Sequence, residues 1–416
     1  MTSLPPALIF FAGALLVGLA PARLRPAMTL LVPLFGGWNL WYVAGGGGLD
    51  VALFDTQLEL VRADKLALLF GILFHLATFL ACIYAFHLRD RMQQVTALIY
   101  AGGALGAVFA GDLITLFIGW EIMAVSSVFL IWARRTPRAS SAGLRYLIMQ
   151  ISSGLLLLAG ALLHISETGS PAFGAMGLGS LAGILIFTAF GIKCAFPLVH
   201  SWLTDAYPEA TPTGMVFLSA FTTKVAIYGL ARSFAGAEVL IYIGTAMAMF
   251  PIFFAVIEND LRRVLAFSLI NQVGFMVVGI GIGSELAMNG AVSHAFNDVL
   301  FKGLLLMSMG AVLHQTGKIN GSELGGLYKT MPITTGLCIV GAASISAFPL
   351  FSGFVSKSMV MVAAAEEGYW IVWLLLLFAS AGVFHHAGIK IPYFTFRGSS
   401  PKAGSVRKLM RFRSRT

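Results

Sequence analysis

The chain has 416 residues, of which 58% are hydrophobic and 11% are charged, and its mean hydropathy is +0.87. A soluble domain carries about 25% charged residues, and a soluble protein of this size could not bury so much apolar surface. The composition therefore excludes a soluble globular protein and indicates a polytopic membrane protein.

Charge and cysteine content exclude two further classes. The net charge of +9 does not indicate a nucleic-acid-binding protein, because the basic residues cluster in short loops and in residues 397–416, which hold seven Lys or Arg and no acid. Cys82, Cys194 and Cys338 lie far apart inside apolar segments, so they are interpreted as packing residues rather than as metal ligands or a disulfide framework.

Thirteen mostly apolar stretches follow one another along the chain, each about long enough to cross a bilayer as a helix. They lie near residues 5–22, 27–45, 66–88, 92–111, 113–133, 144–164, 182–204, 213–233, 238–257, 264–283, 286–315, 333–364 and 369–390. The stretches at 286–315 and 333–364 are too long for one straight crossing, which predicts a tilt or a break in each. Because the first stretch can serve as a signal anchor, no cleaved leader is expected.

The distribution of Lys and Arg over the loops predicts the orientation. They concentrate in the first, third, fifth, ninth and eleventh loops, whereas the even loops hold few and the loop at 45–65 is acidic. By the positive-inside rule this alternation places the N-terminus outside and the C-terminal tail in the cytoplasm. We therefore expect a multi-pass protein of the inner (plasma) membrane.

Acidic and lysine side chains, with two histidines beside them, fall inside five of the apolar stretches. A charged side chain at the bilayer centre costs about 3 kcal/mol or more, so such residues usually face a protein interior and have a partner. They are Glu121 in the fifth stretch, Lys193 and His200 in the seventh, Lys224 in the eighth, His294, Asp298 and Lys302 in the eleventh, and Lys357 in the twelfth.

The spacing of these residues favours a proton path. His294, Asp298 and Lys302 are four residues apart, so a helix places them on one face, and Lys193 and His200, seven apart, are also expected to share a face. Burial disfavours the charged form of a lysine, which makes a buried lysine a candidate proton carrier. The alternative is that these groups form structural ion pairs that lock helices together.

Two prolines predict broken helices. Pro197 and Pro349 fall inside the seventh and twelfth stretches, where each removes a helical hydrogen bond. Both lie within the same four residues, AFPL, at 195–198 and 347–350, and each copy is close to a lysine. Broken helices at membrane depth occur where the chain lines a cavity or an ion path, and the repeated motif suggests paired halves.

Taken together and in this order, several segments resemble the antiporter-like proton-translocating subunits of respiratory complex I and of multisubunit Mrp-type cation/proton antiporters. The resemblance covers about residues 60 to 395. It rests on WEIMAVSSVFLI (120–131), GIKCAFPLVHSWLTDAYPEATPT (191–213), residues 258–276, HAFNDVLFKGLLLMSMGAV (294–312) and FPLFSGFVSK (348–357). HHAGIKIPYF at 385–394 is similar to the D-type subunits of Mrp antiporters.

The resemblance implies an all-α fold with two inverted five-helix repeats whose seventh and twelfth helices are broken. Residues 1–91 would form helices 1–3, residues 92–235 the first repeat, residues 236–395 the second repeat, and residues 396–416 a basic tail that resembles nothing in the family. Asp298 stands where the family often has a histidine.

The same resemblance implies roles for the buried residues. Glu121 would modulate the pKa of Lys193, Lys224 would lead toward the central axis, and Lys302 and Lys357 would be the central and broken-helix lysines of the second half. His200 is a candidate proton relay.

Three functions follow as hypotheses. The first is a proton-translocating subunit of a multisubunit Na⁺ or K⁺/H⁺ antiporter, with other membrane subunits as partners. The second is a proton-pumping membrane subunit of a complex I-like NADH-quinone oxidoreductase or hydrogenase, and the third is an inactive, truncated scaffold. The sequence contains no nicotinamide fingerprint, no cysteine cluster and no haem motif. No cofactor or metal is therefore expected, and any redox chemistry would belong to partner chains.

Overall fold

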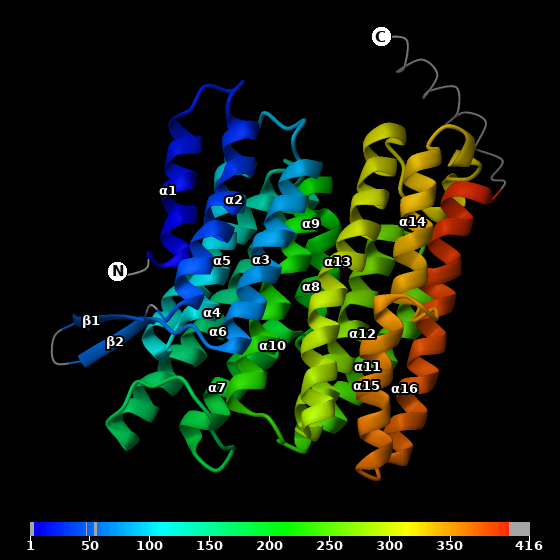
Figure 1. The fold of residues 1–416 in the computed structure, drawn as a ribbon. Helices are drawn as coiled ribbons and strands as arrows, with labels where there is room; N and C mark the ends of the chain where they lie inside the picture. The colour runs from blue at the N-terminus through cyan, green and yellow to red at the C-terminus, as the bar shows by residue number, and fades with distance from the viewer. Residues whose placement is uncertain (1–3, 47, 54–55, 399–416) are drawn as a thin grey trace. The chain divides into compact units, whose positions relative to one another are not determined.

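The computed structural model describes residues 4–46, 48–53 and 56–398. The chain divides into two compact units, one of Met1–Trp202 with Glu209–Ala235 and the other of Leu203–Pro208 with Gly236–Thr416. They are called unit 1 and unit 2 below, and each is described by itself (Figure 1). Within the basic tail predicted at 396–416, the residues from 399 onward lie outside the described part of the chain.

Unit 1 is built from long helices in chain order. They are α1 (Pro6–Leu19), α2 (Arg25–Ala44), α3 (Lys65–Tyr84), α4 (Arg91–Phe109), α5 (Leu113–Trp132), α6 (Pro137–Thr168), α7 (Leu181–Cys194), α9 (Pro212–Ala220) and α10 (Thr222–Ser233). The short helix α8 (Ser201–Ala206) follows α7, and a 3₁₀ turn, η1 (Tyr207–Glu209), precedes α9; most residues of both belong to unit 2.

Aspartates fix where several of these helices begin. Asp64, Asp90 and Asp112 precede α3, α4 and α5, and each carboxylate accepts a backbone N–H of the first turn. Asp64 also pairs with Arg232 of α10 at 2.7 Å. Partial burial raises the pKa of Asp64, but the Ala67 N–H and the Arg232 guanidinium outweigh that effect and hold it below its usual value.

A β-hairpin adds a small sheet to the described part of unit 1. β1 (Leu49–Leu53) pairs antiparallel with β2 (Thr56–Val61), where the sequence predicted only an acidic loop. Backbone hydrogen bonds join its end to α4, since Arg62 N donates to Phe109 O and Gly111 N to Glu59 O. The expected all-α fold therefore carries a small two-stranded sheet.

Unit 2 continues the helical pattern. It contains α11 (Val239–Ile257), α12 (Leu261–Ile282), α13 (Glu285–Thr316), α14 (Pro332–Ile345), α15 (Ser352–Glu366) and α16 (Trp370–Val383). Two 3₁₀ turns, η2 (Gly321–Glu323) and η3 (Leu327–Lys329), follow α13, and the π-helical turns η4 (Phe384–Lys390) and η5 (Tyr393–Arg397) continue α16.

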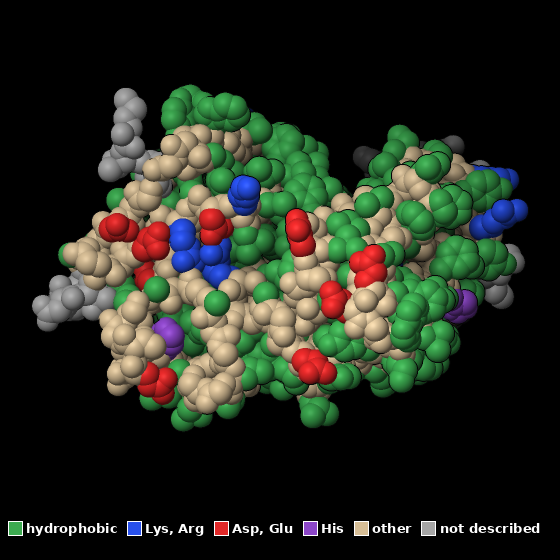
Figure 2. Space-filling model, turned by 60° about the horizontal axis from the view of Figure 1, so that its bottom comes forward, with side chains coloured by type: hydrophobic (Ala, Val, Ile, Leu, Met, Phe, Trp, Pro, Cys, Tyr) green, Lys and Arg blue, Asp and Glu red, His purple; other side chains and the backbone are tan. Residues whose placement is uncertain are grey.

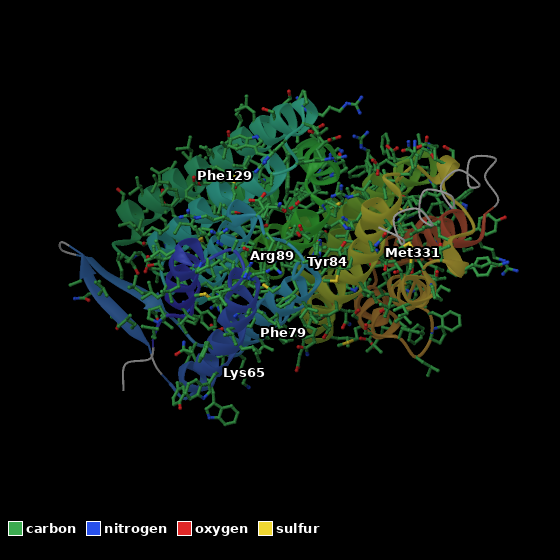
Figure 3. The ribbon with its side chains drawn as sticks, turned by 90° about the horizontal axis from the view of Figure 1, so that it is seen from above. Lys65, Phe79, Tyr84, Arg89, Phe129 and Met331 are labelled. Carbon is green, nitrogen blue, oxygen red and sulfur yellow. The ribbon has the colours of Figure 1, made fainter. Side chains whose placement is uncertain are left out.

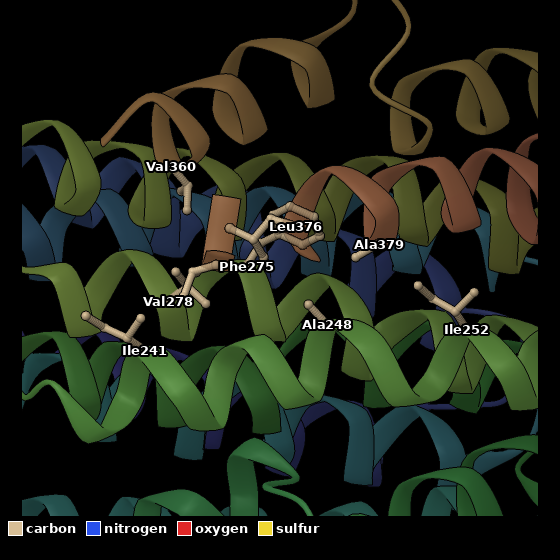
Figure 4. Packing of buried hydrophobic residues seen from close by; sticks show 9 residues of the cluster. Ile241, Ala248, Ile252, Phe275, Val278, Val360, Leu376 and Ala379 are labelled. Carbon is tan, nitrogen blue, oxygen red and sulfur yellow. The ribbon is translucent and has the colours of Figure 1, made fainter. Parts of the chain in front are cut away.

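An apolar cluster holds α11, α12, α15 and α16 together. Phe275 and Val278 of α12 pack against Ile241 and Ala248 of α11, with Leu376 and Ala379 of α16 on the same cluster (Figure 4). Lipid tails are as apolar as these side chains, so van der Waals packing, and not transfer out of water, stabilises such contacts between membrane helices. This cluster therefore contributes close packing to the contacts among these four helices.

The surface fits a lipid environment. Ten helices of the described residues are long and apolar enough to cross a membrane, and three shorter apolar helices, α1, α7 and α14, accompany them. α6 exposes Leu144, Ile148, Leu155 and Leu162, while Figure 2 shows charged side chains gathered on the end of the molecule that faces the viewer. A polytopic helical membrane protein is confirmed, whereas the count of thirteen spans stays a prediction.

The two overlong stretches have different outcomes. The stretch at 333–364 is broken into α14 and α15, but the one at 286–315 is a single helix, α13, of 32 residues. α6 is just as long, because Thr136 and Pro137 start it well before the apolar stretch predicted at 144–164. A polar first turn can therefore make a helix longer than the apolar stretch that hydropathy predicts.

Candidate functional site

The carboxyl group of Glu121 lies between α5 and α6. The residue is half-buried, and its Oε1 is buried without a hydrogen-bond partner among the described residues. Gly154 of α6 leaves the space for it, because a Cβ at Gly154 would collide with Glu121 Oε1. The acid predicted from the sequence thus occupies a niche that requires glycine on the neighbouring helix.

Lys193 of α7 lies next to this niche and is completely buried. Its Nζ donates to Trp120 O at 2.7 Å and lies 4.3 Å from the centroid of the Trp120 ring. Trp120 is itself fixed, since its Nε1 donates to Ser153 Oγ at 3.0 Å and Ser153 Oγ donates to Ala189 O. Glu121 and Lys193 interact electrostatically, and the described contacts contain no direct ion pair between them.

Lys224 follows an interruption that the sequence did not predict. The apolar stretch at 213–233 forms two consecutive helices, α9 and α10, which meet at Phe221, where the backbone is distorted but stays in the right-handed region at φ −109° and ψ −63°. The buried Lys224 Nζ donates to Ser219 O, a carbonyl at the end of α9, at 3.2 Å. The lysine therefore stabilises the irregular segment of backbone where α9 meets α10.

The expectation that Lys193 and His200 share a helix face is wrong. α7 ends at Cys194, and His200 lies in the connection before α8, half-buried. Ala195 adopts a left-handed conformation with φ 62°, and Pro197 has no N–H to continue the helix. The helical period that would align the two residues is lost between them.

In unit 2, His294, Asp298 and Lys302 are all fully buried along α13, as their spacing predicted. His294 Nδ1 lies 2.8 Å from Ser356 Oγ of α15, and its Nε2 lies 3.2 Å from Gln272 Oε1 of α12. Lys302 Nζ donates to Ser268 Oγ of α12 at 2.8 Å. This row of titratable groups therefore faces the contact between α12, α13 and α15.

Lys357 of α15 belongs to the same cluster. It is 1% exposed, its Nζ donates to Ile345 O at 2.8 Å, and the ring centroid of Phe275 lies 5.0 Å away. It interacts electrostatically with Lys302 and Asp298. The candidate residues thus form two sets, with Glu121, Lys193, Lys224 and His200 in unit 1 and His294, Asp298, Lys302 and Lys357 in unit 2.

The two AFPL segments have the same backbone. Ala195 and Ala347 have φ 62° and 56°, and Leu198 and Leu350 both have φ 75°. In each copy the phenylalanine N–H bonds the carbonyl five residues earlier, Phe196 to Gly191 and Phe348 to Ala343. Left-handed geometry costs a non-glycine residue about 1–2 kcal/mol, so two identical strained breaks indicate a shared requirement rather than chance.

Backbone carbonyl groups at the two breaks have different side-chain partners. Ile192 O accepts the indole N–H of Trp202 at 2.9 Å, whereas Ile345 O accepts Lys357 Nζ. In unit 2, therefore, the lysine itself donates a hydrogen bond to a carbonyl group at the break. In unit 1 the lysine instead bonds Trp120 of α5.

Sequence reasoning missed three residues of α6. α6 and α13 are both 32 residues long, and counted from their first residues Tyr146, Gln150 and Gly154 hold the places of His294, Asp298 and Lys302. Gln150 is fully buried, and both atoms of its amide lack hydrogen-bond partners among the described residues. Its signal in the sequence was a lone glutamine inside an apolar stretch.

His386 is also fully buried. It lies in the π-helical turn η4, where its ring is within hydrogen-bonding reach of the backbone of Gly382 in α16. Its neighbour Lys390 is half-buried, and its Nζ donates to Ala255 O and Val256 O near the end of α11. The motif HHAGIKIPYF therefore ties the end of α16 to α11.

Known proteins share this chain's sequence and fold. It is 32% identical over 328 residues to "NADH-quinone oxidoreductase subunit N" of Desulforudis audaxviator, covering 72% of this chain and 65% of that protein. It is 30% identical over 395 residues to a probable K⁺/H⁺ antiporter subunit, of type A/B, of Rhizobium meliloti, covering 86% of this chain and 39% of that protein. A chain of the Mrp complex from Dietzia sp. DQ12-45-1b superposes with a TM-score of 0.83 at 23% identity, covering 96% of this chain and 80% of that one, which shows a common fold.

The chain spans less than two thirds of the length of these two relatives. The sequence model described as "NADH:quinone oxidoreductase/Mrp antiporter, TM" matches residues 110–383, which include every candidate residue of both units. From this match, the chain belongs to the NADH:quinone oxidoreductase/Mrp antiporter transmembrane family.

Proposed function

We propose that this chain is a proton-translocating subunit of a multisubunit antiporter that exchanges Na⁺ or K⁺ for H⁺ together with other membrane subunits. The observation that carries the proposal is the pair of largely buried titratable sets, each with a lysine beside a helix break. Relatives named as antiporter and quinone oxidoreductase subunits support it.

The contacts of Lys193 and Lys357 favour proton transfer over structural ion pairs. Each ammonium donates to a neutral backbone carbonyl, of Trp120 and Ile345, and neither forms an ion pair within the described residues. A buried lysine without a fixed carboxylate partner gives up its proton more readily than one locked in a salt bridge. These lysines are therefore suited to bind and release protons in turn.

We infer further that residues 92–235 and 236–395 are the two inverted repeats, with residues 1–91 as helices 1–3. Besides the two breaks, α6 and α13 both end at a left-handed glycine, Gly169 and Gly317. The aspartates that cap α5 and α12, Asp112 and Asp260, each form an isolated β-bridge, with Ala172 and Asn320. These recurring local features support a duplicated architecture.

The proposal includes the placement in the cell. The basic loops support the inner (plasma) membrane with the N-terminus outside and the C-terminal tail in the cytoplasm. Within the family, the motif HHAGIKIPYF at 385–394 supports a D-type Mrp subunit.

A second candidate is a proton-pumping membrane subunit of a complex I-like or hydrogenase assembly. It is favoured by the similarity to a quinone oxidoreductase subunit, of which this chain covers a larger share than of the K⁺/H⁺ antiporter protein. The two candidates use the same buried groups and differ in the partners that drive them.

The test is to purify the tagged chain with its partners in mild detergent, identify them by mass spectrometry, and reconstitute the complex in vesicles that contain a pH dye. We expect NaCl or KCl pulses, but not choline chloride, to change the internal pH. Proton uptake that depends on NADH or H₂ and not on the cation would select the second candidate. The absence of both responses would favour the inactive scaffold.

Gly154→Ala should lower this cation-driven pH change by about tenfold, because the new methyl group displaces the Glu121 carboxyl group and overpacks the contact of α5 with α6. Gly37→Ala on α2 is the matched control, since a Cβ there meets nothing within 4 Å. Unchanged activity in Gly154→Ala would show that the position of the carboxyl group in this niche is not needed.

A further inference from the structure

An open groove of about 850 Å³ lies on unit 1 between α1, α4 and α5. One face of α1, from Phe11 to Leu19, forms one wall, Val95 and Ile99 of α4 form the floor, and Ile122 and Phe129 of α5 form the other wall. Thr96 also lines it, but its hydroxyl donates to Met92 O within α4, which leaves the walls apolar. The volume is in the range of about 300–1,000 Å³ that small-molecule sites occupy.

The groove has one polar end, where Asp90 and Arg91 begin α4. The Asp90 carboxylate is engaged by the protein, because it accepts from Met92 N at 3.0 Å and Gln93 Nε2 at 3.1 Å and lies 3.8 Å from Arg135 Nη2. Arg91 is exposed and has no hydrogen-bond or ion-pair partner among the described residues. Its Nη2 lies 3.9 Å from where a Cβ of Gly18 would be, so the guanidinium reaches over α1 beside the groove.

The surrounding loops reinforce the positive charge. Arg23 lies between α1 and α2, and Arg25 begins α2. Arg89 precedes α4 and donates to Arg23 O at 3.3 Å. Figure 3, a view from above, labels Arg89 together with Phe129 of the groove wall. Basic residues beside a membrane-spanning helix attract anionic lipids, by about 1 kcal/mol each near the surface.

We propose that this groove binds an anionic phospholipid. Its acyl chain lies along the apolar walls of α1, α4 and α5, and its phosphate accepts hydrogen bonds from the Arg91 guanidinium. An amphiphile matches the distribution of polarity in the groove, because all the charge stands at one end and the remaining length offers no free hydrogen-bonding group. A guanidinium pairs well with a phosphate, since its planar donors bind two oxygens at once.

The groove can be blocked without disturbing the fold. A Cβ at Gly18 would lie 3.6 Å from Val95 Cγ2, an ordinary contact, so Gly18→Leu projects its side chain into the groove. Arg91→Gln removes only the charge at the polar end. Gly37→Leu, on α2, and Arg138→Gln, at the exposed start of α6, are the matched controls.

The test uses the purified complex in phosphatidylcholine nanodiscs that contain a small fraction of phosphatidylglycerol with a diazirine in one acyl chain. After irradiation, mass spectrometry locates the label on peptides, and a photoreactive phosphatidylcholine is the second probe. We expect phosphatidylglycerol to label α1, α4 and α5. Gly18→Leu should lower labelling by both probes, and Arg91→Gln should lower phosphatidylglycerol labelling alone by about tenfold, with both controls unchanged.

Three outcomes would overturn the proposal. Equal labelling by both lipids that Arg91→Gln does not change would mean that the groove holds any acyl chain without recognising an anionic head group. Labelling that Gly18→Leu leaves unchanged would place the lipid elsewhere on the surface. Label transfer to a partner protein instead of to these helices would make the groove a protein interface.

Discussion

Replacing Glu121 by glutamine should lower cation-driven proton movement by about 100-fold, because the amide keeps the size of the side chain but cannot bind and release a proton. The structure sharpens this expectation, since the Glu121 carboxyl group lies in the niche left by Gly154 and interacts with Lys193. Glutamine fits the same niche, so the loss would report titration and not packing. The measurement is the initial rate of the pH change in reconstituted vesicles.

Glu121→Asp should keep more activity than Glu121→Ala, because only aspartate retains a titrating carboxyl group. Glu366→Gln, at the exposed end of α15, removes one acid without touching either buried set and should behave as wild type. Glutamine activity equal to that of wild type would contradict a proton-carrying role of Glu121. Equal activity of the aspartate and alanine variants would contradict the need for a carboxyl group at this site.

Hydropathy and proline positions predict much of this fold. Every predicted apolar stretch contains a helix, and the segments around Pro197 and Pro349 interrupt helices in both units. Such features follow from local chemistry, because an apolar run must bury its backbone polar groups in a helix and a proline cannot continue one. The same locality explains why the face shared by His294, Asp298 and Lys302 could be read from their spacing.

Features that depend on a neighbouring helix escaped the sequence. Nothing in the local sequence of α6 shows that Gly154 holds space for Glu121, or that Gln150 occupies the place of Asp298. The left-handed geometry of Ala195 and Leu198 likewise could not be predicted, because these residue types rarely adopt it. For that reason His200 was wrongly expected to share a helix face with Lys193. The hairpin at 49–61 was missed because acidic residues hid its alternating pattern.

Lys193→Arg should also reduce cation-driven proton movement by about 100-fold, although the charge is retained. A guanidinium stays protonated in proteins, so it cannot release the proton that an ammonium can. Lys193 is fully buried and donates to the neutral carbonyl group of Trp120. Loss of its proton would therefore break one hydrogen bond and no ion pair. The rate in reconstituted vesicles and the recovery of intact complex are measured together.

Lys390→Arg is the matched control, because that half-buried lysine binds the carbonyl groups of Ala255 and Val256 near the end of α11, a role that arginine can fill. The two substitutions are chemically identical, so a loss confined to position 193 separates proton release from the cost of a larger side chain. Full activity of Lys193→Arg would exclude deprotonation there and leave Lys193 as a fixed charge that positions Glu121. Loss of assembly in Lys193→Arg would instead assign the residue a structural role, since a carrier variant must still form the complex.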